Sequence, residues 1–218
     1  MDVSLETIVL WAVPVVFAIT LHEAAHGYVA KLFGDRTAEM LGRITLNPLK
    51  HIDPVGTILV PGMLLALAWI NRSPPFVFGW AKPVPVNFGN LKDPKRDMIW
   101  VAAAGPASNF VQALLWAFAL AVTAPSGPFA SAGLAEMADI GFKVNLVLMA
   151  LNLLPLPPLD GGRVLAGLLP GNASTMLSRL EPYGFFIILV LLALGVLDDL
   201  MRPLIRFAAS VIAKIIGL

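Results

Sequence analysis

The motif His22-Glu23-Ala24-Ala25-His26 combines the residue types of a metal-assisted hydrolytic site at a suitable spacing. On a helix, residues four apart share one face, so both imidazoles can reach a single zinc ion. A glutamate beside the first histidine can activate a water molecule bound to that ion. The motif lies in an apolar stretch, where ionisable side chains are costly and usually functional. The alternative is a buried polar trio that neighbouring helices satisfy.

A catalytic zinc ion uses three protein ligands and keeps one position open, so the two histidines need a third partner. Asp160 is favoured because it follows three prolines that break the end of an apolar helix, and broken backbone at membrane depth must line protein or a cavity. Its alternative role is the N-cap of a helix that starts at Gly161. The other candidates are His51, Asp53, Asp139, Glu181, Asp198 and Asp199.

The composition of the chain excludes several classes of protein. Of the 218 residues, 58% are hydrophobic and only 13% are charged, with a mean hydropathy of +0.81. Too few polar residues remain to cover a water-soluble globule, so a lipid bilayer is the expected surrounding. The lack of cysteine excludes thiolate ligands, and no basic tract indicates a nucleic-acid partner. Asp2 and Glu6 begin the chain without a basic residue, unlike a signal peptide, so the first apolar run is expected to be retained.

The apolar runs predict an all-α membrane protein, a polytopic helical bundle of about five spans in one domain over residues 1–218. The predicted core covers residues 5–162, and residues 183–218 add a C-terminal span and an interfacial helix. In that last helix, Arg206, Ser210 and Lys214 share one face, which is typical of a helix lying in the membrane interface. The alternative for Leu204–Leu218 is a poorly ordered tail. The longer runs are Leu5–Phe33, Asp97–Thr123, Met137–Leu154 and Tyr183–Leu197.

The basic residues predict the orientation of the chain, because cytoplasmic loops collect lysine and arginine. Segments 31–50 and 82–96 are rich in both, so they are expected in the cytoplasm, with the N-terminus and loop 124–136 outside. Val55–Ile70 then makes no net crossing, and its Pro61-Gly62 pair predicts a re-entrant hairpin; a full span is the alternative. This orientation puts the candidate ligands near the cytoplasmic side of the plasma (inner) membrane of a bacterium or archaeon.

The stretch Val77–Asn87 is nearly alternating in character and contains prolines. Because proline is confined to the edges of sheets, this stretch predicts a short extended or β-edge segment. An unwound substrate segment could pair with such an edge as an added strand.

Three motifs together resemble the site-2 protease family of intramembrane metalloproteases. They are HEAAH at 22–26, AGPASN at 104–109 and NLLPLPPLDGG at 152–162, in the family's order and over its core. Two further stretches, GRITLNPLKHIDPVG from Gly42 and FGWAKPVPVN from Phe78, are similar to the small branch that lacks PDZ and CBS domains. The resemblance implies an enzyme that cleaves the transmembrane helix of a membrane-protein substrate.

The resemblance also assigns roles to residues. It implies one zinc ion per chain held by His22, His26 and Asp160, with Glu23 as the catalytic glutamate. Asn152 matches an asparagine that steadies the substrate or the oxyanion. In the middle motif, Gly105 and Pro106 are expected to permit close packing. Asn109 is expected to bind substrate near the site or to have a structural role.

His51 remains open, as does the class of the protein. His51 precedes the run at 55–70, where it could gate the site, add a ligand, bind substrate or cap the turn before Pro54. A membrane metal transporter could use the same histidines and aspartate, but transporters commonly show internal repeats and none is visible. A catalytically silent protein that binds transmembrane helices is the third interpretation.

Overall fold

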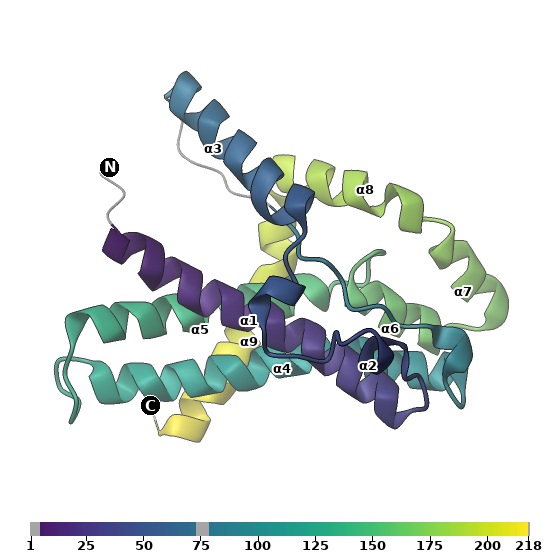
Figure 1. Cartoon of the computed structure of the whole chain (residues 1–218), viewed down its shortest axis with the longest axis horizontal. Coiled ribbons are helices and arrows are strands. Elements are labelled where there is room, and N and C mark those ends of the chain that lie inside the picture. The colour runs from purple at the N-terminus through teal and green to yellow at the C-terminus, as the bar shows by residue number, and fades with distance from the viewer. Residues whose placement is uncertain (1–4, 73–78, 218) are drawn as a thin grey trace.

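The computed structural model describes residues 5–72 and 79–217. Within these ranges the chain is helical and has no strand. Figure 1 shows α1, α4 and α5 together in the body of the molecule, with α3 projecting from it. The longer elements are α1 (Leu5–Leu32), η2 (Pro54–Leu59, a π-helix), α3 (Val60–Asn71), α4 (Pro94–Thr123), α5 (Ala132–Asn152), α6 (Asp160–Leu168), α7 (Gly171–Ser178), α8 (Glu181–Ala193) and α9 (Val196–Ile216). Three short elements are α2 (Thr37–Met40), η1 (Pro48–Lys50) and η3 (Phe88–Asn90).

In the part of the chain that the structure describes, two helices are long and apolar enough to cross a membrane, within α1 and α4. They coincide with the first two predicted spans and match them in length and composition. Most of the run at 137–154 lies in α5. Among the described residues, α5 is not one of the helices that are long and apolar enough to cross a membrane. Helices α7 and α8 meet at an angle of 65° and would count as a third span only if taken as one. The predicted total of five spans is therefore not confirmed.

Helix α4 is the central element and packs against α1, α5, α6 and α9. It begins as local rules expect, with Asp93 accepting a hydrogen bond from the Arg96 N–H and with Pro94 in the first turn. Small side chains on its buried face, including Ala113 and Ala117, let neighbouring helices approach closely. They form a core cluster with Leu146 and Met149 of α5 and with Ala208 and Ile212 of α9.

The C-terminal segment is a packed helix, so the alternative of a poorly ordered tail is wrong. α9 crosses α4 and α5 (Figure 1) and buries Ala208 and Ile212. Arg206, Ser210 and Lys214 are exposed, as their shared face predicts. That this face lies in the membrane interface stays a prediction. The preceding predicted span ends early, because the chain turns at Gly195, which has a φ of +72°.

The expected hairpin at Pro61-Gly62 is not seen. The π-helix η2 leads into α3, which continues through both residues to Asn71. Pro61 lies in the first turn of α3, where a missing N–H costs little. The side chains of Ile58, Met63 and Ile70 are exposed, as expected for a helix that faces lipid. Whether residues 55–70 make a net crossing stays a prediction.

The predicted β edge is also not seen. Val77 and Phe78 lie outside the described residues, and residues 79–87 form no strand. Pro83 and Pro85 lack an N–H, so they interrupt the donors that a ladder requires. Four N–H groups of this segment donate to other parts of the chain: Trp80 to Gly56, Lys82 to His51, Val84 to Glu23 and Asn87 to Asp35.

Candidate metal centre

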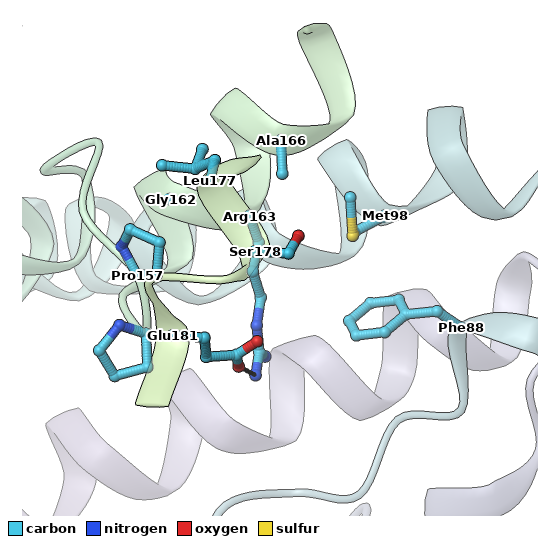
Figure 2. A pocket seen from close by; sticks show the side chains of 10 residues that line it. Phe88, Met98, Pro157, Gly162, Arg163, Ala166, Leu177, Ser178 and Glu181 are labelled. Carbon is cyan, nitrogen blue, oxygen red and sulfur yellow. Dashed lines mark ion pairs between the residues drawn. The ribbon is translucent and has the colours of Figure 1, made fainter. Parts of the chain in front are cut away.

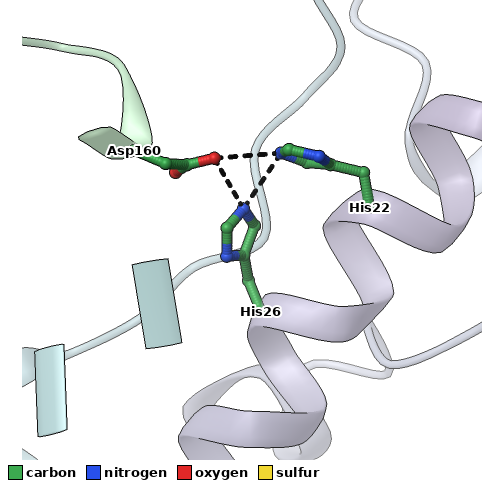
Figure 3. Close-up of side chains that lie close together, drawn as sticks. All are labelled: His22, His26 and Asp160. Atoms are coloured by element: carbon green, nitrogen blue, oxygen red, sulfur yellow. Dashed lines mark hydrogen bonds and ion pairs between the residues drawn. The ribbon is translucent and has the colours of Figure 1, made fainter. Parts of the chain in front are cut away.

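The three predicted ligands converge from two distant parts of the chain (Figure 3). His22 and His26 project from one face of α1, with their Nε2 atoms 3.1 Å apart. Asp160 Oδ2 lies 3.2 Å from His22 Nε2 and 3.4 Å from His26 Nε2. All three side chains are largely buried, at 12% exposure or less. One face of α1 and the first residue of α6 thus bring three possible ligand atoms together.

The hydrogen bond of each Nδ1 atom determines which nitrogen of the histidine ring carries the hydrogen. His26 Nδ1 lies 2.7 Å from the Val101 carbonyl oxygen, which can only accept, so Nδ1 carries the hydrogen. His22 Nδ1 lies 2.6 Å from Asn109 Oδ1 and donates to it. In the neutral rings, both Nε2 atoms therefore carry a lone pair and no hydrogen. This is the tautomer that outer hydrogen bonds impose on metal-binding histidines.

The orientation of the Asn109 amide follows from two further contacts. Its Nδ2 lies 3.2 Å from the Ala18 carbonyl and 2.8 Å from Asn145 Oδ1. Asn145 Nδ2 in turn donates to the Gly141 carbonyl over 2.9 Å. Because main-chain carbonyls only accept, they fix both amides, and Asn109 must present its oxygen to His22. Asn109 and Asn145 are fully buried, so this chain of bonds links α1, α4 and α5 away from solvent.

This arrangement fits a metal ion. Tetrahedral zinc with ligands at about 2.0–2.1 Å separates its ligand atoms by about 3.3 Å, close to the three observed distances. Asp160 Oδ2 is buried and has no hydrogen-bond donor within the described chain. It faces two imidazole lone pairs, and three electron-rich atoms this close repel one another unless a cation lies among them. Two nitrogens and one oxygen are a common ligand set for catalytic zinc.

Gly105 explains how α4 reaches the histidines. A Cβ at this position would collide with His26 Nε2 and with the His22 ring. Only glycine lets the α4 backbone pass this close, which agrees with the close packing expected from the AGPASN motif. Pro106 beside it is fully buried.

Asp160 is the first residue of α6, and the capping alternative is wrong. Leu159 occupies the N-cap position, and no side chain caps this helix. The Asp160 carboxylate instead turns towards α1. A negative charge in a first helical turn is also favoured by the helix dipole. The three prolines at 155–158 end the preceding helical stretch and leave room for this new helix start.

Glu23 is half-buried on α1, next to His22 but outside the ligand set. Its Oε2 accepts a hydrogen bond of 2.7 Å from the Val84 N–H. The carboxylate is thus held at one oxygen while Oε1 is left for other contacts. A carboxylate that adjoins the metal ligands without being one of them suits the role of a general base.

The remaining predicted residues are not among the metal ligands. Asn109 is fully buried behind His22, so it offers no surface to a substrate and supports the structural alternative. Asn152 is half-buried at the end of α5, where Nδ2 donates to the Leu148 carbonyl. His51 is buried, is not grouped with the metal ligands, and contacts the Thr45 carbonyl at 3.1 Å. Asp53 caps η2, which begins at Pro54, by accepting from the Val55 and Gly56 N–H groups. His51 ends the preceding turn η1, where its main-chain N–H donates to the Pro48 carbonyl over 2.9 Å.

Three contributors to the site were missed from the sequence: Asn145, the Val101 carbonyl and the Val84 N–H. Asn145 had a visible signal, because an amide in the middle of an apolar helix needs a buried partner. The other two are main-chain groups that only the packing of distant segments identifies.

A separate pocket of about 210 Å³ opens beside α6 (Figure 2). At its edge Arg163 lies 3.7 Å from Glu181 and stacks over the Phe88 ring at 5.6 Å. The metal ligands and Glu23 do not line it, so it lies outside the centre described above. Its lining consists of Phe88, Met98, Pro157, Pro158, Gly162, Arg163, Ala166, Leu177, Ser178 and Glu181.

Comparison with known proteins gives several relatives and one family. The model of peptidase family M50 matches residues 118–195, which include Asp160 but not the histidine pair. A Bacillus subtilis protein named "Putative zinc metalloprotease YwhC" is 39% identical over 93% of this chain and 89% of its own length. The protein Rip2 of Mycolicibacterium smegmatis, described in the same words, is 33% identical over 80% of this chain and 63% of its own.

Rip2 of Mycobacterium tuberculosis strain H37Rv is 29% identical over 80% of this chain and 62% of its own. No solved structure matches the chain. The first relative is matched over most of both chains, and its alignment extends well beyond the part that the family model covers. The chain therefore belongs to peptidase family M50, the site-2 protease family, and is a zinc metallopeptidase.

Proposed function

We propose that this enzyme hydrolyses a peptide bond within or near the transmembrane segment of a membrane protein. The observation that carries the proposal is the position of His22, Glu23 and His26 on α1, a helix long and apolar enough to span a membrane. A hydrolytic site on such a helix is within reach of substrates that are themselves in the bilayer. Buried polar groups on α4 and α5 support the same site from within the bundle.

The chain's own residues have distinct tasks in this reaction. His22, His26 and Asp160 would hold the zinc ion, which when bound polarises a carbonyl group and lowers the pKa of water. Glu23 accepts a proton from the attacking water and passes it to the leaving amine. Asn152 uses one amide hydrogen on Leu148, and its second is available to the developing oxyanion.

The substrate helix must unwind near the site, because its backbone hydrogen bonds shield the peptide bond. Strand addition along residues 79–87 is restricted, since Pro83 and Pro85 offer no donor. The Lys82 and Pro83 carbonyls already accept hydrogen bonds from Arg43. The unwound segment would therefore be held chiefly at the metal centre, by Asn152 and by the remaining carbonyls of this segment.

The proposed location is the plasma (inner) membrane of a bacterium or archaeon, with the site towards the cytoplasm. The support is the excess of lysine and arginine in segments 31–50 and 82–96. Cytoplasmic water would reach the site from that side.

The test maps new protein N-termini in the native host that expresses either wild-type enzyme or the Glu23→Gln variant. Cleavage sites inside transmembrane segments should be present with wild type and absent with the variant. Zinc content, measured on both purified proteins, should stay near one ion per chain. Identical cleavage maps with full zinc content would contradict the proposal and favour a silent helix-binding protein.

A further inference from the structure

Residues 79–87 and residues 43–56 form one unit over the active-site face of α1. The Lys82 N–H donates to the His51 carbonyl over 2.9 Å, and the Trp80 N–H donates to the Gly56 carbonyl over 3.1 Å. Alternate N–H groups of an extended chain point to the same side. Residue 84 is next in this alternation, and its N–H meets Glu23. The two stretches therefore lie side by side where they approach the proposed base.

Arg43 is the buried side chain that joins this unit. Arg43 is only 8% exposed. Its Nη2 donates to the Lys82 carbonyl over 2.8 Å and to the Pro83 carbonyl over 3.3 Å. A buried guanidinium is costly unless hydrogen bonds compensate for its lost hydration. Here the partners are two consecutive main-chain carbonyls. Arg43 thereby fixes the peptide units that directly precede Val84.

Val84 carries the only N–H between Pro83 and Pro85, and that N–H is bonded to Glu23 Oε2. Its side chain is buried against α1 at Gly27, one helical turn beyond Glu23. A Cβ at Gly27 would lie 3.0 Å from Val84 Cγ1 and 3.1 Å from Ile44 Cγ1. Because Gly27 has no side chain, residues 43–56 and 79–87 can both pack against α1 next to Glu23.

We propose that Arg43 is a positioning residue for the Glu23 carboxylate, acting through the Lys82 and Pro83 carbonyls and the Val84 N–H. The proposal rests on the function proposed above, in which Glu23 is the general base. A hydrogen bond to one carboxylate oxygen restricts the rotation of the side chain. A misplacement of about 1 Å at a reacting group can cost about 100-fold in rate.

A matched pair of variants isolates this role. Arg43→Met keeps a long apolar stem and removes the donors. Arg43→Lys restores them, because both hydrogen bonds of Arg43 come from a single nitrogen and lysine also carries its donors on one nitrogen. Val84→Pro removes the N–H itself, whereas Val84→Ala keeps it. Arg36→Met is the control for loss of a guanidinium, because Arg36 is exposed.

The first measurement is hydrogen–deuterium exchange of the Val84 amide in the purified zinc-loaded protein, which needs no substrate. Exchange should be slow in wild type, Arg43→Lys and Arg36→Met, and at least about tenfold faster in Arg43→Met and Glu23→Ala. The second is cleavage of fluorescein-labelled β-casein. Arg43→Met should lower kcat about 100-fold with KM and zinc content unchanged, and Arg43→Lys should recover most of the rate.

Equal exchange of the Val84 amide in wild type and Arg43→Met would overturn the proposal. Loss of zinc in Arg43→Met would overturn it too, because the role would then be structural. If Glu23→Gln abolishes cleavage while Arg43→Met cleaves at the wild-type rate, the proposed function stands and the positioning role fails. If wild type binds no zinc, the proposed function fails, and the exchange rates still decide whether Arg43 places the Val84 N–H.

Discussion

His22 Nδ1 lies 2.6 Å from Asn109 Oδ1, although 87 positions separate the two residues. This hydrogen bond places the ring hydrogen on Nδ1, so the lone pair of His22 Nε2 is directed at Asp160 and His26. The Asn109 amide is oriented by the Ala18 carbonyl and by Asn145 Oδ1, which both accept from its Nδ2. A residue of α5 two hydrogen bonds away therefore helps to set the tautomer of this ligand.

We expect Asn145→Ala to weaken zinc binding by about 10- to 100-fold, the usual effect of losing an outer partner of a ligand. The Asn109 amide would lose its shorter hydrogen bond, to α5, and keep only the 3.2 Å contact with the Ala18 carbonyl, so its oxygen would be held less firmly on His22. Competition with a chelator of known affinity measures the effect. Thr123→Val, which removes a buried hydroxyl at the C-terminal end of α4, is the control and should bind zinc as wild type does. Equal affinities for wild type and Asn145→Ala would contradict the relay.

Gly105→Ala should prevent the centre from forming. The added methyl would occupy the space of the His26 and His22 rings, so α4 must move away or the rings must turn. Overpacking of this kind costs about 1–3 kcal/mol in fold stability, and it also displaces the ligands. Zinc content by elemental analysis should fall below about a tenth of the wild-type value. Gly133→Ala is the matched control, because a Cβ there meets nothing within 4 Å.

Asp160→Asn should lower zinc content, whereas His51→Ala should leave it unchanged. The neutral amide lacks the negative charge with which the carboxylate would bind the zinc ion, and His51 is not grouped with the ligands. Both variants are compared by zinc content after dialysis against the same buffer. A loss of zinc in His51→Ala alone would restore His51 as a ligand in another conformation of the protein.

The parts of this site that the sequence predicted are those with local or chemical signatures. The histidine pair follows from helical spacing, and Asp160 from a proline-broken helix end. The contributions of Asn145, Val101 and Val84 depend on which helices meet, and no local pattern reports that. Two main-chain groups among them have no side-chain signature at all.

The fold shows the same division. The runs that form α1 and α4 were recognised because a long apolar helix is defined by composition alone. The prediction of a hairpin at Pro61-Gly62 was wrong, because proline is tolerated in the first turn of a helix and the pair does not break α3. The edge strand at 77–87 was wrong in its described part because Pro83 and Pro85 remove the donors of a ladder. In that segment extended character came from proline rather than from pairing.

Asp35 predicts a pH dependence of stability away from the metal. It is fully buried just after α1, and its carboxylate accepts hydrogen bonds from Thr37, from the Asn87 N–H and from Asn90. Burial alone would raise its pKa, but the hydrogen bonds from Thr37, Asn90 and Asn87 outweigh it and lower the pKa below the ordinary 3.8. Because the folded pKa is depressed, the stabilisation is present above pH 3.8 and is lost as the pH falls below it.

Asp35→Asn should therefore destabilise the protein by about 3 kcal/mol at neutral pH, since it turns one acceptor into a donor that faces other donors. Thermal unfolding in detergent, followed by tryptophan fluorescence, should give a lower midpoint for the variant at pH 7. The difference between the two midpoints should shrink as the pH falls below 3.8, because the stabilisation from the wild-type carboxylate is lost there. Taking the difference cancels the other carboxylates and the metal ligands, which titrate in both proteins. A gap that stays constant from pH 7 to pH 3 would show that Asp35 acts through packing rather than through its charge.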